Sequence, residues 1–198
     1  MIKENETNIE FTETYITNRE HYFPMLNIRI GRNVKIGKGT KIFENTIVRK
    51  NVTIGEGNII GNSCLIRENV VIGNNNKIGF SCSLEPHLIM GDNNSTQGFC
   101  MLSEYSVIKN ENFFPPHFNN PADNSIGKPK GEYIARPAII GSRCRFGSGT
   151  RLVPEIVIAD GTITGAMSLV TKDTEPNSLY YGVPAKKIRD IKEGDELR

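Results

Sequence analysis

The sequence contains no tryptophan and no long apolar run. No stretch approaches the roughly 20 apolar residues that cross a bilayer, so we expect no membrane insertion. The N-terminal segment MIKENETNIEF is polar and lacks the apolar core of a secretory signal. These absences predict a cytoplasmic protein.

An excess of charge of one sign is also missing. The chain has 24 Lys and Arg against 22 Asp and Glu, for a net charge of +2. No basic stripe with interleaved aromatic residues occurs, so we expect no nucleic-acid partner. The 4 cysteines form no CxxC pair, which disfavours a zinc knuckle and favours reduced thiols.

What the chain does have is a repeat of six residues. Apolar residues recur at every sixth position from Ile30 to Ile108, with Thr96 as the exception, and glycine often follows, as at Gly31 and Gly37. This period matches neither an amphipathic helix nor a simple alternating strand. It is typical of short strands separated by corners, in which three repeats close one triangular coil. The sequence therefore predicts an all-β fold, a parallel β-helix of hexapeptide repeats.

We call the apolar residues at every sixth position the anchors. The residues four positions after each anchor support a coil of three repeats. Sorted so that every third repeat falls in one column, they form three columns of distinct chemistry. The columns are Val34, Val52, Val70, Leu88 and Ser106; Thr40, Asn58, Asn76 and Asn94; and Thr46, Cys64, Cys82 and Cys100. We expect the cysteines and asparagines to form stacked inward ladders, and a redox or metal role for the cysteines is the less favoured alternative.

The repeat also divides the chain. The six-residue frame breaks after Ile108 and resumes at Ile140, so we expect one long inserted loop at about 109–136, a segment rich in Pro, Asn and Gly. Residues 1–27 are expected to form an N-terminal cap segment, and 28–175 the β-helix. Pro184 predicts a short C-terminal helix, within a helix and tail at 176–198.

Two passages carry a resemblance to a known family. The C-terminal part reads SLVTKDTEP at 168–176 and GVPAKKIR at 182–189, and the inserted segment places His117 after two prolines. With the repeats of 28–175, these phrases resemble the hexapeptide-repeat acyltransferase superfamily, in particular galactoside, maltose and serine acetyltransferases and nucleotide-sugar N-acetyltransferases. Two positions depart from it: Arg145 stands where tryptophan is common, and Phe118 follows His117 where sugar O-acetyltransferases have proline.

The resemblance implies a left-handed β-helix and a homotrimer. It implies acetyl-CoA as the acyl donor, bound in the groove between protomers, a loop histidine as the base, and no metal. The expected function is acyl-CoA-dependent acetyl transfer to a sugar acceptor, such as the amino group of a nucleotide-linked amino sugar. Acetylation of a sugar hydroxyl is the alternative.

The candidate site residues fall into three groups. His117 is the candidate general base, because an imidazole with a pKa near neutrality suits removal of the acceptor's proton. Glu85, His87 and Asn119 are candidates for binding the acceptor. For CoA, small residues would line the bottom of a groove that holds its extended arm. The resemblance implies further contacts at the phrase TKD, residues 171–173. Basic side chains would pair with the phosphates. These candidates are Gly147, Ser148, Gly165, Ala166, Thr171, Lys172, Lys187 and Arg189.

Two remote alternatives remain open. A zinc enzyme of the carbonic anhydrase type on the same helix would need three histidines gathered at a trimer interface, and only His87 and His117 are expected near one. A non-catalytic β-helix scaffold would not need the TKD and GVPAKKIR phrases.

Overall fold

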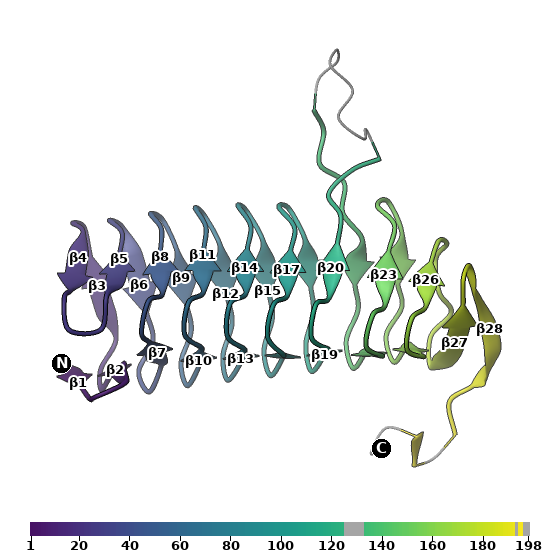
Figure 1. Ribbon diagram of the computed structural model, residues 1–198, viewed down its shortest axis with the longest axis horizontal. Helices are drawn as coiled ribbons and strands as arrows, with labels where there is room; N and C mark the ends of the chain where they lie inside the picture. The colour runs from purple at the N-terminus through teal and green to yellow at the C-terminus, as the bar shows by residue number, and fades with distance from the viewer. Residues whose placement is uncertain (125–132, 193, 196–198) are drawn as a thin grey trace.

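The computed structural model describes residues 1–124, 133–192 and 194–195, and these form one elongated parallel β-helix (Figure 1). Its strands are short, because each anchor residue and its neighbour form one side of a triangular coil before the chain turns. The coils stack through backbone hydrogen bonds between strands three repeats apart, such as the bond from the Ile59 N–H to the Asn76 carbonyl of 2.9 Å. The predicted fold class is confirmed, consistent with a left-handed β-helix.

The strands form three sheets. The 11-stranded sheet comprises β1 (Ile2–Glu4), β2 (Asn8–Phe11), β7 (Lys41–Phe43), β10 (Ile59–Ile60), β13 (Lys77–Ile78), β16 (Ser95–Thr96), β19 (Phe113–Phe114), β22 (Arg145–Phe146), β25 (Ile163–Thr164), β27 (Ser178–Gly182) and β28 (Ala185–Asp190). The 9-stranded sheet comprises β4 (His21–Phe23), β5 (Ile28–Ile30), β8 (Ile47–Val48), β11 (Leu65–Ile66), β14 (Ser83–Leu84), β17 (Met101–Leu102), β20 (Asn119–Asn120), β23 (Arg151–Leu152) and β26 (Leu169–Val170). The 8-stranded sheet comprises β3 (Tyr15–Thr17), β6 (Val34–Ile36), β9 (Thr53–Ile54), β12 (Val71–Ile72), β15 (Ile89–Met90), β18 (Val107–Ile108), β21 (Ile139–Ile140) and β24 (Val157–Ile158).

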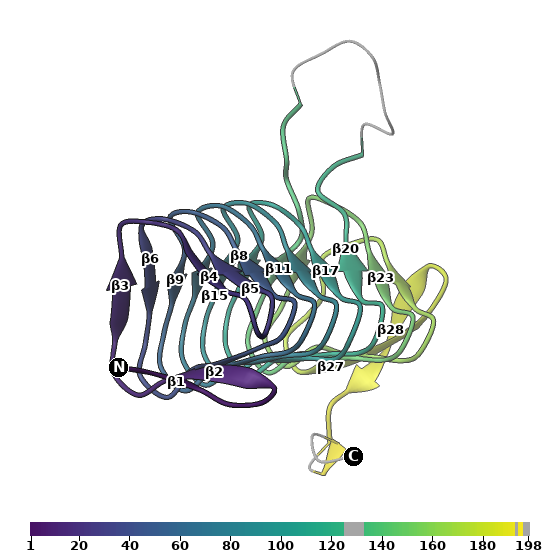
Figure 2. The same ribbon diagram turned by 60° about the vertical axis from the view of Figure 1, so that its left-hand side comes forward.

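The N-terminal segment 1–27 covers the open end of the first coil. Strands β2, β3 and β4 run antiparallel to β7, β6 and β5, so one cap strand pairs with the first coil strand of each sheet. This pairing satisfies backbone groups that an exposed sheet edge would leave open to other chains. The cap lies at one end of the helix and β27 and β28 lie at the other (Figures 1 and 2).

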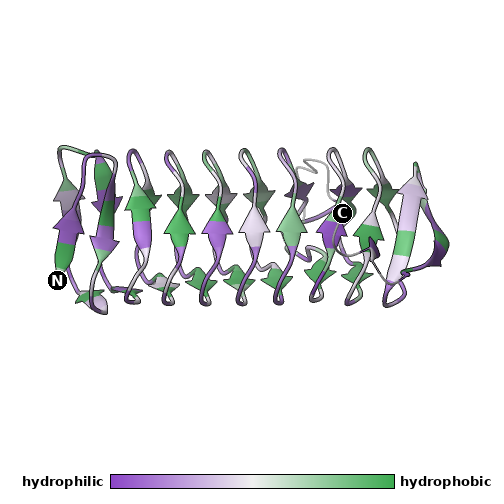
Figure 3. Ribbon diagram, turned by 90° about the horizontal axis from the view of Figure 1, so that it is seen from below, coloured by the Kyte–Doolittle hydropathy of each residue, from purple (hydrophilic) through white to green (hydrophobic). Residues whose placement is uncertain are grey.

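The interior consists of the predicted columns. The apolar anchors are buried along the whole helix, and apolar residues recur on its short strands from end to end (Figure 3). The cysteine ladder is confirmed: the Sγ atoms of Cys64, Cys82 and Cys100 each donate to a backbone carbonyl of the next coil, at 3.0, 3.1 and 3.2 Å. Burial raises the pKa of the Cys144 thiol to about 12, so that this side chain stays neutral at physiological pH.

The asparagine ladder is confirmed as well, and it extends to Asn112. The Oδ1 atom of Asn76 accepts from the backbone N–H of Asn94 at 2.8 Å, and its Nδ2 donates to the Gly91 carbonyl at 2.9 Å. Each buried amide thus satisfies backbone groups at a corner of the coil, which apolar side chains could not do.

We expect Asn76→Ala to lower the free energy of unfolding by about 2–4 kcal/mol, because it leaves several buried polar groups unsatisfied. Urea denaturation measures this change. Asn62→Ala is the matched control, since Asn62 is exposed and should shift stability by less than about 0.5 kcal/mol. Equal stability of the two variants would show that the ladder does not hold the coils together.

The predicted C-terminal helix is wrong. Residues 185–190 form strand β28, which pairs antiparallel with β27 and extends the 11-stranded sheet. A helix of so few residues is marginal in water, whereas β28 gains ladder hydrogen bonds to its neighbour. A hairpin therefore closes this end of the helix.

The inserted loop is shorter than the expected 109–136. The coil continues through β19 and β20, and the chain leaves it only after Asn120, returning at β21. Phe114 and Phe118 fill the interior here, with ring centroids 5.4 and 4.8 Å from that of Phe146. The described residues between β20 and β21 are 121–124 and 133–138, here called the excursion, and they leave the helix at the edge between the 9-stranded and 8-stranded sheets (Figure 2). Among the described residues, no helix has the length and hydrophobicity needed to cross a bilayer.

Candidate functional site

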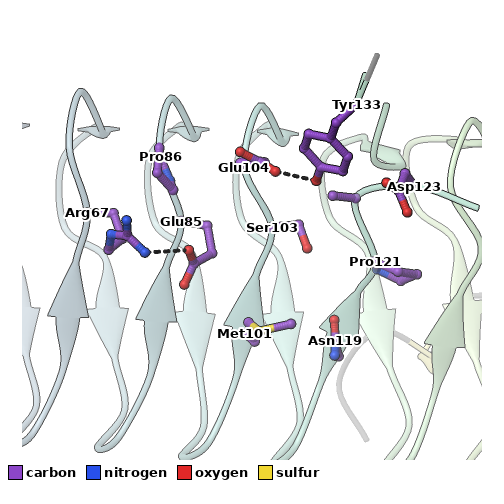
Figure 4. A pocket seen from close by; sticks show the side chains of 11 residues that line it. Arg67, Glu85, Pro86, Met101, Ser103, Glu104, Asn119, Pro121, Asp123 and Tyr133 are labelled. Carbon is purple, nitrogen blue, oxygen red and sulfur yellow. Dashed lines mark hydrogen bonds and ion pairs between the residues drawn. The ribbon is translucent and has the colours of Figure 1, made fainter. Parts of the chain in front are cut away.

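A pocket of about 510 Å³ lies on the 9-stranded sheet at the base of the excursion (Figure 4). The strands β11, β14, β17 and β20 supply its wall, and the excursion supplies its far side. This pocket, here called the acceptor pocket, is lined by Arg67, Glu85, Pro86, Met101, Ser103, Glu104, Asn119, Pro121, Ala122, Asp123 and Tyr133. Its position follows from the coil, because residues 67, 85 and 103 occupy the same corner of successive turns.

Carboxylates dominate the polar groups of the acceptor pocket. Glu85 accepts from Arg67 Nη1 at 3.2 Å and from Ser83 Oγ at 2.5 Å. Glu104 accepts a hydrogen bond from the Tyr133 hydroxyl, which raises the pKa of Tyr133 to about 12. With Asp123 also in the lining, three carboxylates face one guanidinium, so the pocket favours a cationic or hydrogen-bond-donating ligand.

Asn119 adds an unused acceptor to this pocket. Its Oδ1 atom is covered from solvent and has no hydrogen-bond partner within the described part of the chain. A buried acceptor without a partner costs free energy, which a ligand N–H or O–H in the pocket would recover. The structure thus brings together Glu85 and Asn119, two of the residues expected to bind the acceptor.

The third, His87, is not among the lining residues. It occupies a corner with a positive φ of 63° and stacks on Tyr105 at a centroid distance of 4.7 Å. Histidine is enriched in this conformation relative to most other non-glycine residues. His87 is exposed on the same edge as the excursion, so it is a neighbour of the pocket and not a part of its lining.

His117 lies on the opposite edge of the same sheet. It sits at the corner before β20 with φ of 59°, and its exposed ring stacks on Phe99 at 5.0 Å. Its carbonyl accepts a hydrogen bond from Arg151 Nη1 at 2.5 Å. Asn119 follows two positions later in the extended chain, so the imidazole corner lies roughly 7 Å from the pocket wall.

Three of the candidate CoA residues share this edge with His117, hereafter the His117 edge. Ser148 and Ala166 occupy its next two coils and are exposed, and the Met167 N–H donates to the Ser148 carbonyl at 2.8 Å. Gly147 lies so close to the coil behind it that a Cβ there would overlap the backbone of Gly165 and Ala166. Small residues therefore follow His117 along one edge.

Gly165 does not belong to that open floor. The ring of Tyr181 lies directly over it, where a Cβ would clash with the ring carbons, and Gly165 is buried. Its lack of a side chain serves the packing of the C-terminal hairpin against the last coil.

The remaining CoA candidates lie elsewhere. Thr171 and Lys172 follow β26 on the excursion edge, across the sheet from Ala166. Lys187 is paired with Glu175 at 2.6 Å and Asp190 at 2.7 Å, and Arg189 pairs with Asp195 at 2.6 Å. Both would have to exchange these partners to bind a phosphate.

Arg67 and Glu104 were missed by the sequence reasoning. A step of three repeats in either direction from Glu85 would have found Arg67 and Ser103 beside it. Tyr133 could not have been found in this way, because it reaches the pocket from the excursion, outside the repeat.

The described residues contain no group of three or more His, Cys, Asp or Glu side chains arranged to hold a metal ion. His21 lies in the N-terminal cap, where its Nδ1 is 2.5 Å from the Tyr15 hydroxyl, and His87 and His117 lie on different edges. Within the described part of one protomer, the three histidines therefore lie apart from one another.

Comparison with known proteins finds similarity over part of the chain. The model for bacterial transferase hexapeptide repeats matches residues 27–68. The galactoside O-acetyltransferase of Escherichia coli is 36% identical over 77 residues, 39% of this chain and 37% of that protein. A chloramphenicol acetyltransferase of Agrobacterium fabrum is 35% identical over 82 residues, 41% of this chain and 36% of that protein.

Among solved structures, LpxA from Acinetobacter baumannii superimposes with a TM-score of 0.56 at 20% identity, covering 81% of this chain and 64% of that chain. This likeness shows the shared fold. The matched segments span little more than a third of the curated relatives, 37% of the first and 36% of the second. Residues 27–68 thus match the hexapeptide repeats of bacterial transferases, and they lie within the parallel β-helix.

Proposed function

We propose that the protein is an acetyl-CoA-dependent acetyltransferase whose acceptor is the amino group of a nucleotide-linked amino sugar. The observation that carries the proposal is the alignment on the His117 edge. An exposed imidazole is followed on the next two coils by small, exposed corners at Ser148 and Ala166, and the acceptor pocket opens across the same sheet. The curated relatives with acetyltransferase names support the choice of reaction.

Each part of the site would have a defined task. The pantetheine arm of CoA would lie along Gly147, Ser148 and Ala166, with its thioester beside His117. The acceptor amine would lie between His117 and the acceptor pocket, where Asn119 Oδ1 accepts one of its N–H bonds. The acidic lining favours an amine over an anionic acceptor group at this position.

In the proposed reaction, His117 transfers one proton from the acceptor amine to the leaving thiolate. The amine nitrogen attacks the thioester carbonyl carbon, and His117 takes the proton that the nitrogen must lose. Collapse of the tetrahedral intermediate breaks the carbon–sulfur bond, and the thiolate leaves with the proton returned by the imidazolium. The products are an acetamido sugar and CoA.

A homotrimer is part of this proposal. The outer face of the 8-stranded sheet carries a row of aliphatic side chains that are between 39% and 50% exposed. The row consists of Val71, Ile89, Val107, Ile139 and Val157. Burial of such a row against another protomer removes apolar area from water, and it would give each CoA site a second wall. We further propose that the protein is cytoplasmic, where acetyl-CoA is available.

The test is incubation with acetyl-CoA and a panel of acceptors while release of the CoA thiol is followed. We expect the fastest release with amino-sugar nucleotides and a product with an amide. Acetylation only of sugar hydroxyls would replace the proposal by the O-acetyltransferase alternative. Failure of saturating CoA to raise the melting temperature would favour a non-catalytic scaffold.

A further inference from the structure

Two exposed phenylalanines continue the His117 edge on the N-terminal side of His117. The ring of Phe99 stacks on the imidazole of His117 at a centroid distance of 5.0 Å, and the ring of Phe80 packs edge-on against Phe99 at 4.9 Å. Both phenylalanines, here called the aromatic pair, are 49% exposed. They therefore offer open apolar surface directly beside the candidate general base.

The backbone at this edge is arranged to hold these rings outside the core. Phe99 has a positive φ of 60°, which is uncommon for a bulky side chain, and the same corner one coil earlier is Ser81. Gly98 makes room for the neighbouring ring, because a Cβ at this position would lie 2.6 Å from a ring carbon of Phe80. Since large apolar side chains are more often buried, an exposed pair of them points to a ligand.

The His117 edge is also free of charge over six coils. The corner residues of these coils include no acidic or basic side chain other than the imidazole of His117; they are residues 61–63, 79–81, 97–99, 115–117, 147–149 and 165–167. The edge that carries the excursion differs, since it holds Arg67, Glu85 and Glu104. A neutral, apolar group therefore fits the aromatic pair better than a phosphate or an amine does.

We infer that the aromatic pair binds the acyl chain of the donor, so that the site transfers acyl groups of up to about eight carbons as well as acetyl. This inference rests on the proposed function, in which the pantetheine arm runs from His117 toward Ser148 and Ala166. The acyl chain of an extended thioester points away from that arm. It would therefore leave His117 in the N-terminal direction, over Phe99 and then Phe80, while the acceptor approaches from the side of Asn119.

The length of the aromatic pair sets the length of the chain. The two ring separations add to roughly 10 Å, and an extended chain advances about 1.2 Å per bond, so about eight carbons reach the far ring. One coil beyond Phe80, the edge presents Asn62 and Ser63, which are polar and exposed. Further carbons would lie against polar groups and gain no apolar contact.

The reaction with a longer donor is the one already proposed. The amine nitrogen forms a bond to the thioester carbonyl carbon, and the carbon–sulfur bond breaks. The proton that the nitrogen loses passes through His117 to the leaving thiolate. The products are an N-acyl amino sugar with a longer chain and CoA.

The test is titration calorimetry with acetyl-CoA, octanoyl-CoA and dodecanoyl-CoA in the absence of an acceptor. Contact on one side of a chain contributes about twofold in affinity per methylene, half the free energy of full burial. We expect octanoyl-CoA to bind about tenfold to a hundredfold more tightly than acetyl-CoA, and dodecanoyl-CoA to bind no more tightly than octanoyl-CoA.

The double variant Phe80→Ser/Phe99→Asn should remove the preference for octanoyl-CoA and leave the Kd of acetyl-CoA unchanged. Asparagine is chosen because it tolerates the positive φ at residue 99. Tyr105→Asn is the matched control, since Tyr105 has φ of 58°, is 52% exposed and stacks on His87 at the other edge of the sheet. This control should keep the preference, and a thermal melt of each variant checks that the fold is intact.

The outcomes separate the inference from the proposed function. Equal affinity of the wild-type protein for acetyl-CoA and octanoyl-CoA, or a preference that survives in the double variant, overturns the inference even if acetyl transfer is found. A change of oligomeric state in the double variant, seen by light scattering, assigns the phenylalanines to contact between copies and overturns it as well. If the preference depends on the phenylalanines but no acceptor is acylated, the acyl site stands and the proposed reaction fails.

Discussion

Replacing His117 by asparagine should lower kcat for acetyl transfer about 10²–10⁴-fold, the usual contribution of a general base. Asparagine suits this test because, like histidine, it tolerates the positive φ of 59° at this corner. The ring of His117 is exposed and stacks only on Phe99, so its loss leaves no cavity in the core. We therefore expect an unchanged melting temperature together with the loss of rate.

The chain supplies a closely matched comparison in His87→Asn. His87 has φ of 63° and stacks on Tyr105 with an interplanar angle of 4°, as His117 stacks on Phe99 with an angle of 3°. Because His87 is not in the lining of the acceptor pocket, its variant should keep kcat within a few-fold of the wild type. A His117→Asn protein that acetylates at the wild-type rate would remove His117 from the mechanism.

The second large effect concerns assembly. Ile89→Glu places a carboxylate in the middle of the exposed aliphatic row of the 8-stranded sheet. In a trimer this would bury three carboxylates without partners, at a cost of several kcal/mol each. We expect light scattering to show a change from trimer to monomer, with the circular dichroism of the β-helix retained and acetyl transfer lost.

Thr53→Glu is the matched control for Ile89→Glu. Thr53 is the in-register neighbour of Val71 on the same face, it is exposed, and it is already polar. It should leave the trimer intact. A monomeric wild-type protein, or a trimer that survives Ile89→Glu, would show that this row is not the interface.

Much of the fold could be predicted because residues of the same chemical type recur at fixed positions of the repeat. Steps of three repeats located the cysteine and asparagine ladders correctly, since each inward position has its own chemistry. The start of the excursion was misplaced because Phe114 and Asn120 keep the frame of six without the aliphatic residue and glycine that mark other coils. The C-terminal helix was wrong because pairing with β27, a tertiary contact, decides the conformation of 185–190.

The candidate site was predicted only in part, for a related reason. Glu85 and Asn119 line one pocket because β14, which precedes Glu85, and β20, which holds Asn119, belong to one sheet, as a count of coils implies. The ion pair of Arg67 with Glu85 is set by side-chain geometry at an edge. The ring of Tyr181 over Gly165 depends on how the hairpin folds back, and no local pattern shows it.

The most direct test of this account is a crystal structure of the protein with CoA bound. The account predicts that the pantetheine arm follows Gly147, Ser148 and Ala166 and that the sulfur atom lies within hydrogen-bonding reach of the His117 imidazole. A CoA molecule whose sulfur lies on another edge of the helix, away from His117 and the pocket with Asn119, would contradict it.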